Sequence, residues 1–472
     1  MFIQKKSFNF FIFTSLIFLF SFFLNFNNYV GNKFIFFIFQ SVSFVLFITA
    51  VKKNKSAFEF FTYFFFLLSF WFKFNCILYF ENIKVSEGDF DLTISNYDNA
   101  SIIIICTFVA CICASFIKEF IINNFIKDTK YKMSNFFIRF YKYYRVIIFS
   151  AWIGFLILVW GSNYYYEIYF KGLVYEGAFP GLTYFYSWSL VYGLAALTSI
   201  LIYIDFIIFK KKIVFFLGIF ESFFTQMSIY SRSFLLSFFA YLRGFLFLSK
   251  IKKLRFSKFT VGKIFILILI IFFLSIYSSV KLRSTKFYET DKLGVPITFS
   301  SLYSDIISLS INRWVGIDAL LAVSQNKNLS FNFFLSAWQE EKNLNKKSFY
   351  IDNFFSRFNY SGFEKKNLNI IITPGIVAFL YYSGSALFVF FSILFLILIC
   401  SAIEMLFFYY SLGNIILANI IGYALSVRFI HFGYIPFNSI NFLLSFLITF
   451  FIIYFLTKII QKKILKNNIH IN

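Results

Sequence analysis

The chain has 472 residues, 60% of them hydrophobic, and a formal net charge of +23. It contains 81 phenylalanines and 31 tyrosines, more apolar surface than a soluble core of this length can cover. This excludes a soluble globular domain and makes lipid the expected solvent. The positive charge lies mostly in short segments between apolar runs, so it indicates membrane orientation rather than nucleic-acid binding.

Apolar runs of near-bilayer length recur about twelve times along the chain. They predict an all-α fold, a polytopic integral membrane helix bundle of about 12 transmembrane helices with a large, partly helical outer loop. The first run has no small-residue cleavage site, so we expect a retained span. The predicted spans are residues 8–26, 34–51, 58–80, 101–117, 146–161, 185–209, 213–230, 233–249, 264–280, 376–405, 411–427 and 438–457.

The segments between the spans alternate in charge. Lysine and arginine are concentrated in residues 5–6, 52–55, 118–145, 210–212, 250–263 and 458–466. The other connections are mixed or acidic, as with Glu81, Glu87 and Asp89 after the third span. Because basic loops stay on the cytoplasmic side, both termini are predicted to be cytoplasmic.

One outer loop is much longer than the others and divides the chain into three parts. We predict nine transmembrane helices in residues 1–280, a large extracytoplasmic loop in 281–370, and three more helices in 371–472. Loops of this length are commonly functional. Apolar residues recur at helical spacing over 299–325, which predicts an amphipathic helix that packs back over the bundle.

Four arginines fall at or beyond the outer face, against the positive-inside rule. Arginine clamps phosphates and carboxylates through two parallel hydrogen bonds, so these residues predict a site for an anionic, membrane-borne substrate. We assign three as catalytic candidates and Arg283 as a substrate-binding candidate. The catalytic candidates are Arg232, Arg313 and Arg428.

Other polar residues are weaker candidates. Substrate-binding roles are considered for Asp318, His431, Tyr434 and the intramembrane Glu221, and each is also a possible proton acceptor. Acidic residues near the inner ends of spans, Asp205 and Glu404, are expected to be interfacial, and Arg243 is expected to snorkel inward. No cysteine has zinc-ligand spacing with a histidine, so neither a metal site nor a cofactor is expected.

Three short motifs resemble the bacterial O-antigen and capsule repeat-unit polymerases of the Wzy type. They are Ser231-Arg232-Ser233-Phe-Leu-Leu, Ile311-Asn312-Arg313-Trp314-Val315-Gly316 and Thr373-Pro374-Gly375 with the residues up to Gly384. The spans and the long late loop are similar as well. The resemblance implies an inner-membrane glycosyltransferase that joins oligosaccharide repeat units carried on undecaprenyl pyrophosphate at the outer face.

The same resemblance implies the partners: the lipid-linked oligosaccharide, the bilayer and, as a further candidate, a chain-length regulator. Two alternatives stay open. An O-antigen ligase shares the donor but uses a lipid A–core acceptor, whereas a lipid-linked oligosaccharide flippase or transporter would have charges lining its spans and no need of a large loop. A channel is disfavoured because no repeated filter segment is present.

Overall fold

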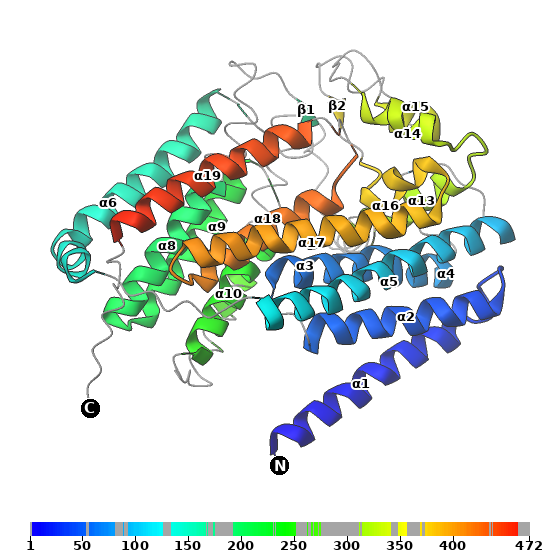
Figure 1. Cartoon of the computed structure of the whole chain (residues 1–472), viewed down its shortest axis with the longest axis horizontal. Coiled ribbons are helices and arrows are strands. Elements are labelled where there is room, and N and C mark those ends of the chain that lie inside the picture. Colours follow the sequence, from blue (N-terminus) through cyan, green and yellow to red (C-terminus); the bar gives the residue numbers. More distant parts are fainter. Residues whose placement is uncertain are drawn as a thin grey trace, which may run out of the picture.

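In the residues that the computed structural model describes, the regular structure is helical apart from one pair of two-residue strands (Figure 1). The structure describes residues 2–52, 56–80, 88, 93–125, 134–166, 168, 173–174, 192–229, 231, 233–251, 262, 266–267, 269–271, 273–274, 311, 314–340, 348–355, 369–370, 373–433, 436 and 438–460.

The amino-terminal half contains α1 (Phe2–Asn25), α2 (Lys33–Lys52), α3 (Ala57–Phe66), the π-helical turn η1 (Leu67–Phe72), α4 (Lys73–Tyr79), α5 (Ile94–Phe125), α6 (Asn135–Tyr166), β1 (Leu173–Val174), α8 (Tyr192–Phe209), the short η3 (Lys212–Phe215), α9 (Phe216–Ser228) and α10 (Phe234–Ile251). The remainder contains α13 (Ile317–Ser324), α14 (Phe331–Trp338), α15 (Phe349–Phe354), β2 (Asn369–Ile370), α16 (Ile376–Leu380), η7 (Tyr381–Ser383), α17 (Ala386–Tyr410), α18 (Ile415–Ile430) and α19 (Asn438–Ile460).

Within the described residues, five helical stretches are long and apolar enough to cross a membrane. They are Lys33–Val51, Ala57–Tyr79, Ser95–Ile122, Asn135–Tyr166 and Ala386–Tyr410. Shorter apolar helices accompany them, among them α9 and α18. The structure therefore has the helical, membrane-protein character that the sequence predicts, while the total of about 12 spans stays a prediction.

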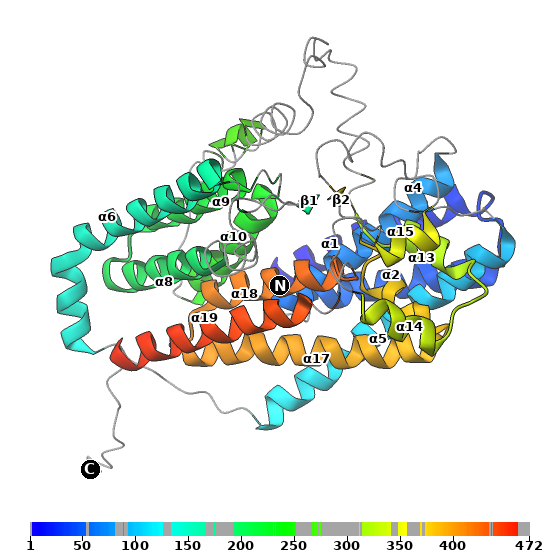
Figure 2. The same cartoon turned by 90° about the horizontal axis from the view of Figure 1, so that it is seen from above.

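The helices form two groups joined by the carboxy-terminal ones. In Figure 2, α6, α8, α9 and α10 lie on the left, α1 to α5 lie on the right, α17 and α18 run beside both, and α19 packs on α17. The central member is α18, which packs on α3 and α17 as well as on α8 and α10. Almost all of its side chains from Ile416 to Ser426 are buried, so it has no face left for lipid.

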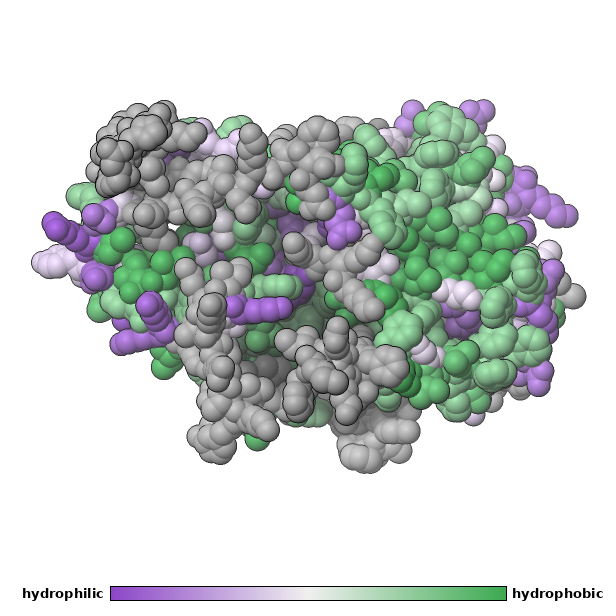
Figure 3. All heavy atoms as spheres, turned by 60° about the horizontal axis from the view of Figure 1, so that its bottom comes forward, coloured by the Kyte–Doolittle hydropathy of each residue, from purple (hydrophilic) through white to green (hydrophobic). Residues whose placement is uncertain are grey.

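Helices at the edge of the bundle have the opposite character. In α6 and in α17 only 22% of the most apolar 18 residues are buried inside the protein, against 67% in the stretch Ala57–Tyr79. Large apolar side chains such as Phe391 and Phe395 are exposed on α17. Figure 3 shows apolar residues over most of the right-hand part of one face and polar residues gathered at its far right end. This is the surface expected where lipid replaces water.

Helices from the predicted large loop pack on one end of the bundle. In Figure 1, the loop helices α13 to α15 gather at the right-hand end beside α16, and α13 contacts α5, α15 and α16. Every residue of α13 from Ile317 to Val323 is buried. The described helices between residues 317 and 354 thus pack on the bundle, while the large outer loop itself stays a prediction.

The expected loop helix 299–325 is not continuous in its described part. Ile311 is helical and α13 begins at Ile317, but Trp314 to Gly316 between them are not helical, and Gly316 precedes α13 with φ +156°. The expected span 376–405 is likewise interrupted, because Gly384 adopts φ +72° and Ser385 caps a new helix at Ala386. A left-handed glycine followed by a serine cap ends one helix and starts another.

The strand pair joins two distant segments. Leu173 pairs with Ile370 and Val174 with Asn369 in antiparallel register. The first strand follows α6 and the second ends the predicted large loop. Two connections that the sequence assigns to the same side of the membrane thus lie together.

Candidate functional site

A π-helical turn places a lysine inside the third apolar stretch. Here α3 passes into η1 at Leu67 and α4 begins at Lys73; such turns are frequent at functional sites. The Lys73 side chain is fully buried, and its Nζ lies 2.7 Å from Oδ2 of Asp318 and donates a hydrogen bond to the Trp314 carbonyl at 3.1 Å. Burial raises the pKa of Asp318, and the Lys73 ammonium opposes that shift. This pair holds the start of α13 against α4.

Three distant segments meet next to this ion pair. The amide of Gly375 donates to the carbonyl of Phe432 at 3.1 Å. Gly375 has φ +80°, and a Cβ there would lie 3.1 Å from Cγ1 of Val315 and 3.2 Å from the carbonyl oxygen of Ile430. A side chain at this position would be strained by the backbone conformation and would press on both neighbours. We call residues 314–316, 373–375 and 430–433 the three-segment junction.

Aromatic side chains tie the junction to α3. The ring of Trp314 lies 6.0 Å from that of Phe65, and the ring of Phe429 lies 6.0 Å from that of Phe66. Trp314 directly follows one predicted arginine in the sequence, and Phe429 directly follows Arg428. One of the resemblance motifs and the end of α18 therefore contact consecutive residues of α3.

Of the predicted site residues, four lie within the described part of the chain. Arg428 is half-buried in the last turn of α18, and His431 is exposed at the end of that helix, with Nδ1 3.0 Å from the Val427 carbonyl. Asp318 faces Lys73, as described above, and Glu221 lies in a separate cavity. Outside the described residues are Arg232, Arg283, Arg313 and Tyr434.

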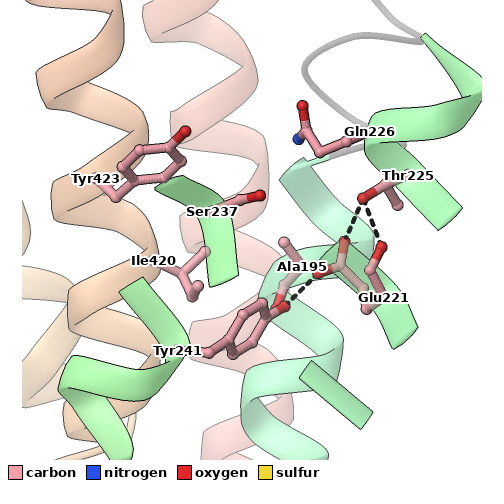
Figure 4. Close-up of a pocket in the computed structure, with 8 residues that line it drawn as sticks. All are labelled: Ala195, Glu221, Thr225, Gln226, Ser237, Tyr241, Ile420 and Tyr423. Atoms are coloured by element: carbon pink, nitrogen blue, oxygen red, sulfur yellow. Dashed lines mark hydrogen bonds between the residues drawn. The ribbon is translucent and has the colours of Figure 1, made fainter. Parts of the chain in front are cut away.

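The cavity lies below the hairpin that connects α9 to α10. Ser231 Oγ and Ser233 Oγ are 2.6 Å apart, and Ser233 donates to Oε1 of Gln226 at 2.6 Å. Gln226 lines a space of about 20 Å³ between α8, α9, α10 and α18 (Figure 4). This is room for about one water-sized occupant. The other lining residues are Ala195, Glu221, Thr225, Ser237, Tyr241, Ile420 and Tyr423.

Glu221 is the charged group of this cavity, and only 2% of it is exposed. Its Oε2 accepts a hydrogen bond from the Tyr241 hydroxyl at 2.7 Å, and its Oε1 accepts one from Thr225 at 3.0 Å (Figure 4). Tyr423 precedes Arg428 by five residues, a rise of about 7.5 Å along α18. The cavity is therefore near the three-segment junction along α18 but is not part of it.

A second set of buried charges lies around the first turn of α3. Oε1 of Glu404 accepts from the amide of Ala57 at 2.7 Å, and its Oε2 accepts from the amide of Phe58 at 2.8 Å. A carboxylate from α17 thus caps the positive end of α3. In the same turn, Glu59 forms a buried ion pair with Lys118 of α5.

Arg243 of α10 joins the same region. Its Nη1 donates to Oδ1 of Asn419 at 2.5 Å and its Nη2 donates to the carbonyl of Ser56 at 3.2 Å. The guanidinium is buried within the bundle. Asp205 and Glu404, which the sequence places near the inner ends of spans, are buried by protein as well, and Asp205 is paired with Arg145 at 2.6 Å.

Sequence reasoning missed two residues of these clusters. Glu59 and Lys73 both lie in the predicted span 58–80, and a charge inside an apolar span is a recognised indication of a functional or paired group. The signal was therefore present. Their partners, Lys118 and Asp318, lie far away in sequence, and no local pattern links them.

Comparisons with known proteins give no match: no family model, no curated protein and no solved structure is similar to this chain.

Proposed function

We propose that the chain is a membrane glycosyltransferase that uses a pyrophosphate-linked, lipid-borne oligosaccharide, and within that class a repeat-unit polymerase. One observation carries the proposal. Two motifs of the resemblance, around Trp314 and around Pro374, meet the end of α18, which bears Arg428 and His431. A half-buried arginine beside a close-packed junction of loop and bundle is suited to an anionic headgroup at a membrane surface.

The chemistry fits these residues. A hydroxyl oxygen of the incoming unit forms a bond to the anomeric carbon of the growing chain. The bond from that carbon to the pyrophosphate oxygen breaks, and its electron pair leaves with the pyrophosphate. The hydroxyl proton passes to a base or to solvent. Arg428 would stabilise the charge on the departing pyrophosphate, since fixed donors in a site with little water act most strongly where charge develops.

His431 is the best placed proton acceptor among the described candidates. It follows the last turn of α18 within the three-segment junction and is exposed. Asp318 is engaged with Lys73, and Glu221 lies deeper in the bundle. An imidazole near neutral pH has the right affinity to take up a hydroxyl proton.

The second candidate, a flippase for the same lipid, is favoured by the charges found inside the bundle. Glu59, Lys118 and Arg243 all lie within apolar helices. These groups are paired with one another or with helix ends, as Glu404 is with α3. Charges paired in this way hold helices together and do not line a passage for the lipid, so the enzyme remains the better explanation.

A reconstituted assay tests the proposal. Full-length protein in vesicles would receive a pyrophosphate-linked repeat unit, with product length and released lipid pyrophosphate as readouts. We expect Arg428→Ala to lower the rate about a hundredfold or more, and Arg428→Lys to restore it partly. Arg139→Ala on the exposed part of α6 is the matched control and should leave the rate unchanged.

The products separate the candidate functions. Lengthened oligosaccharide on the lipid indicates a polymerase, whereas transfer only to lipid A–core indicates a ligase. Movement of the lipid across the bilayer with no new glycosidic bond would establish the flippase and overturn the proposal. Full activity of a normally folded Arg428→Ala variant would remove this arginine from the site.

A further inference from the structure

Among the described residues, Glu221 differs from every other buried carboxyl. Asp205, Asp318 and Glu59 each lie beside a basic side chain. Glu404 accepts two amide hydrogen bonds at the start of α3. For Glu221 the described part of the chain supplies neither a basic side chain nor a helix end.

The groups around Glu221 offer it only neutral donors. The Tyr241 hydroxyl has one proton to donate. Its oxygen lies 2.7 Å from Oε2 of Glu221 and 3.0 Å from the carbonyl oxygen of Ala195. The Thr225 hydroxyl lies 3.0 Å from Oε1 and 2.7 Å from the carbonyl of Glu221 itself. Each of these two hydroxyl protons is therefore shared between a carboxylate oxygen of Glu221 and a backbone carbonyl.

The other groups that face the cavity do not compensate the charge. Its remaining titratable group is a phenol, Tyr423 of α18, and α8 contributes only Ala195. The helices that pack against α9 carry charged groups with partners of their own: Arg145 on α6 pairs with Asp205 on α8, and Arg243 on α10 donates to Asn419 and to the carbonyl of Ser56. An ionised carboxylate buried in this way is costly unless a positive charge joins it.

The cavity has the size and the chemistry for one small cation. Its volume of about 20 Å³ admits a single water-sized occupant. Besides Glu221, oxygen atoms of Thr225, Gln226 and Ser237 line it (Figure 4). Oxygen ligands with one carboxylate suit a hard cation of single charge. Intramembrane carboxylates in other membrane proteins often bind protons or sodium ions.

We infer that this cavity binds one monovalent cation, a proton or Na⁺, which neutralises Glu221. A proton would bond to Oε2, which then donates to the Tyr241 oxygen, and Tyr241 donates to the carbonyl of Ala195. A sodium ion would instead be held by the carboxylate and the neighbouring hydroxyl oxygens. The inference concerns the bundle itself and stands whether or not the chain is a glycosyltransferase.

Thermal unfolding of the purified full-length protein tests the inference. The midpoint would be measured in Na⁺ and in choline at equal ionic strength, each from mildly acidic to mildly alkaline pH. The variant Glu221→Gln keeps the shape without the charge. Asp352→Asn, which changes an exposed carboxyl on α15, is the matched control.

Two results support the inference and distinguish the cations. If Na⁺ is the ligand, the wild-type midpoint rises by several degrees in Na⁺ relative to choline, most clearly at alkaline pH, because a ligand stabilises the state that binds it. If a proton is the ligand, the midpoint falls as pH increases, equally in both salts. Glu221→Gln should lose either response, and Asp352→Asn should keep it.

Identical responses of wild type and Glu221→Gln to both pH and Na⁺ would overturn the inference. If the glutamine variant does not fold, the wild type alone decides. Infrared spectra would show a protonated carboxyl that Glu221→Asp shifts, or radioactive sodium would bind at one ion per chain. Finding neither would also overturn it.

Discussion

Two carboxylates buried in the same bundle have very different surroundings. Glu59 of α3 lies against the ammonium of Lys118, and Ser401 is 3.4 Å from its Oε1. Glu221 of α9 has hydroxyl groups, an empty space and no basic neighbour among the described residues. Around α3 the charged groups pair with one another and join helices. On α9 the carboxyl group of Glu221 instead faces a cavity large enough for one small ligand. Pairing, rather than burial, separates a structural charge from a candidate site.

The same contrast applies to the start of α4. Lys73 and Asp318 are both fully buried and joined at 2.7 Å, so they belong with Glu59 and Lys118 as structural charges. Their position next to the three-segment junction gives them a positioning role in the proposed site. In that role the pair determines where the loop lies and takes no part in a chemical step.

The largest expected effect comes from breaking this pair. Lys73→Met leaves Asp318 buried without its partner and should lower the free energy of unfolding by roughly 3–5 kcal/mol. Chemical denaturation in detergent measures this. The double variant Lys73→Met with Asp318→Leu should recover much of the loss, because two apolar side chains replace two charges. A single variant as stable as the wild type would show that the pair holds nothing together.

A smaller effect is expected from adding a side chain at the three-segment junction. Gly375→Ala forces a side chain into φ +80° and against Val315 and Ile430, which should cost about 1–3 kcal/mol. Gly154→Ala in α6 is the matched control, because nothing lies within 4 Å of its added Cβ. That change should be neutral or stabilising by up to about 1 kcal/mol. Equal effects of the two substitutions would contradict the close approach of the segments.

The sequence predicts the character of this fold better than its details. Apolar runs locate α2, α5 and α17 because a membrane helix requires a continuous apolar stretch. The runs do not locate the break at Gly384 or the start of α13 at Ile317, since these depend on backbone conformation and on tertiary contacts. A π-helical turn such as η1 likewise has no simple sequence signal.

The candidate site shows the same limit. Arg428 and His431 were selected because they lie at the end of a span, and the structure puts that end beside two motifs chosen separately. The structural role of Asp318 depends on its partner Lys73, which lies some 245 positions earlier in the chain. Only tertiary structure brings such partners together, so sequence reasoning assigned Asp318 to substrate binding without knowing that it has a buried cation beside it.

The smallest effect is expected from removing one hydroxyl on each side of the comparison. Tyr241→Phe takes a donor from Glu221, and Tyr63→Phe takes one from the carbonyl of Cys111 and from Ser115 near Glu59. Each should cost about 0.5–1.5 kcal/mol, the usual net value of a hydrogen bond. The size of the two losses is therefore not informative, but their dependence on solution conditions is.

At Tyr63 the neighbouring carboxylate is already neutralised by Lys118, so its loss should be the same in Na⁺ and choline and at any mild pH. At Tyr241 the hydroxyl and the proposed cation stabilise the same carboxylate. When the cation is absent, Glu221 depends more on its hydroxyl donors, because a buried ion with fewer hydrogen bonds is less stable. The effect of Tyr241→Phe should thus be larger in whichever condition, choline or alkaline pH, lowers the wild-type midpoint. Melting both variants across the two salts measures it, and a Tyr241→Phe effect that is constant across all of them would mean that the two carboxylates are compensated in the same way.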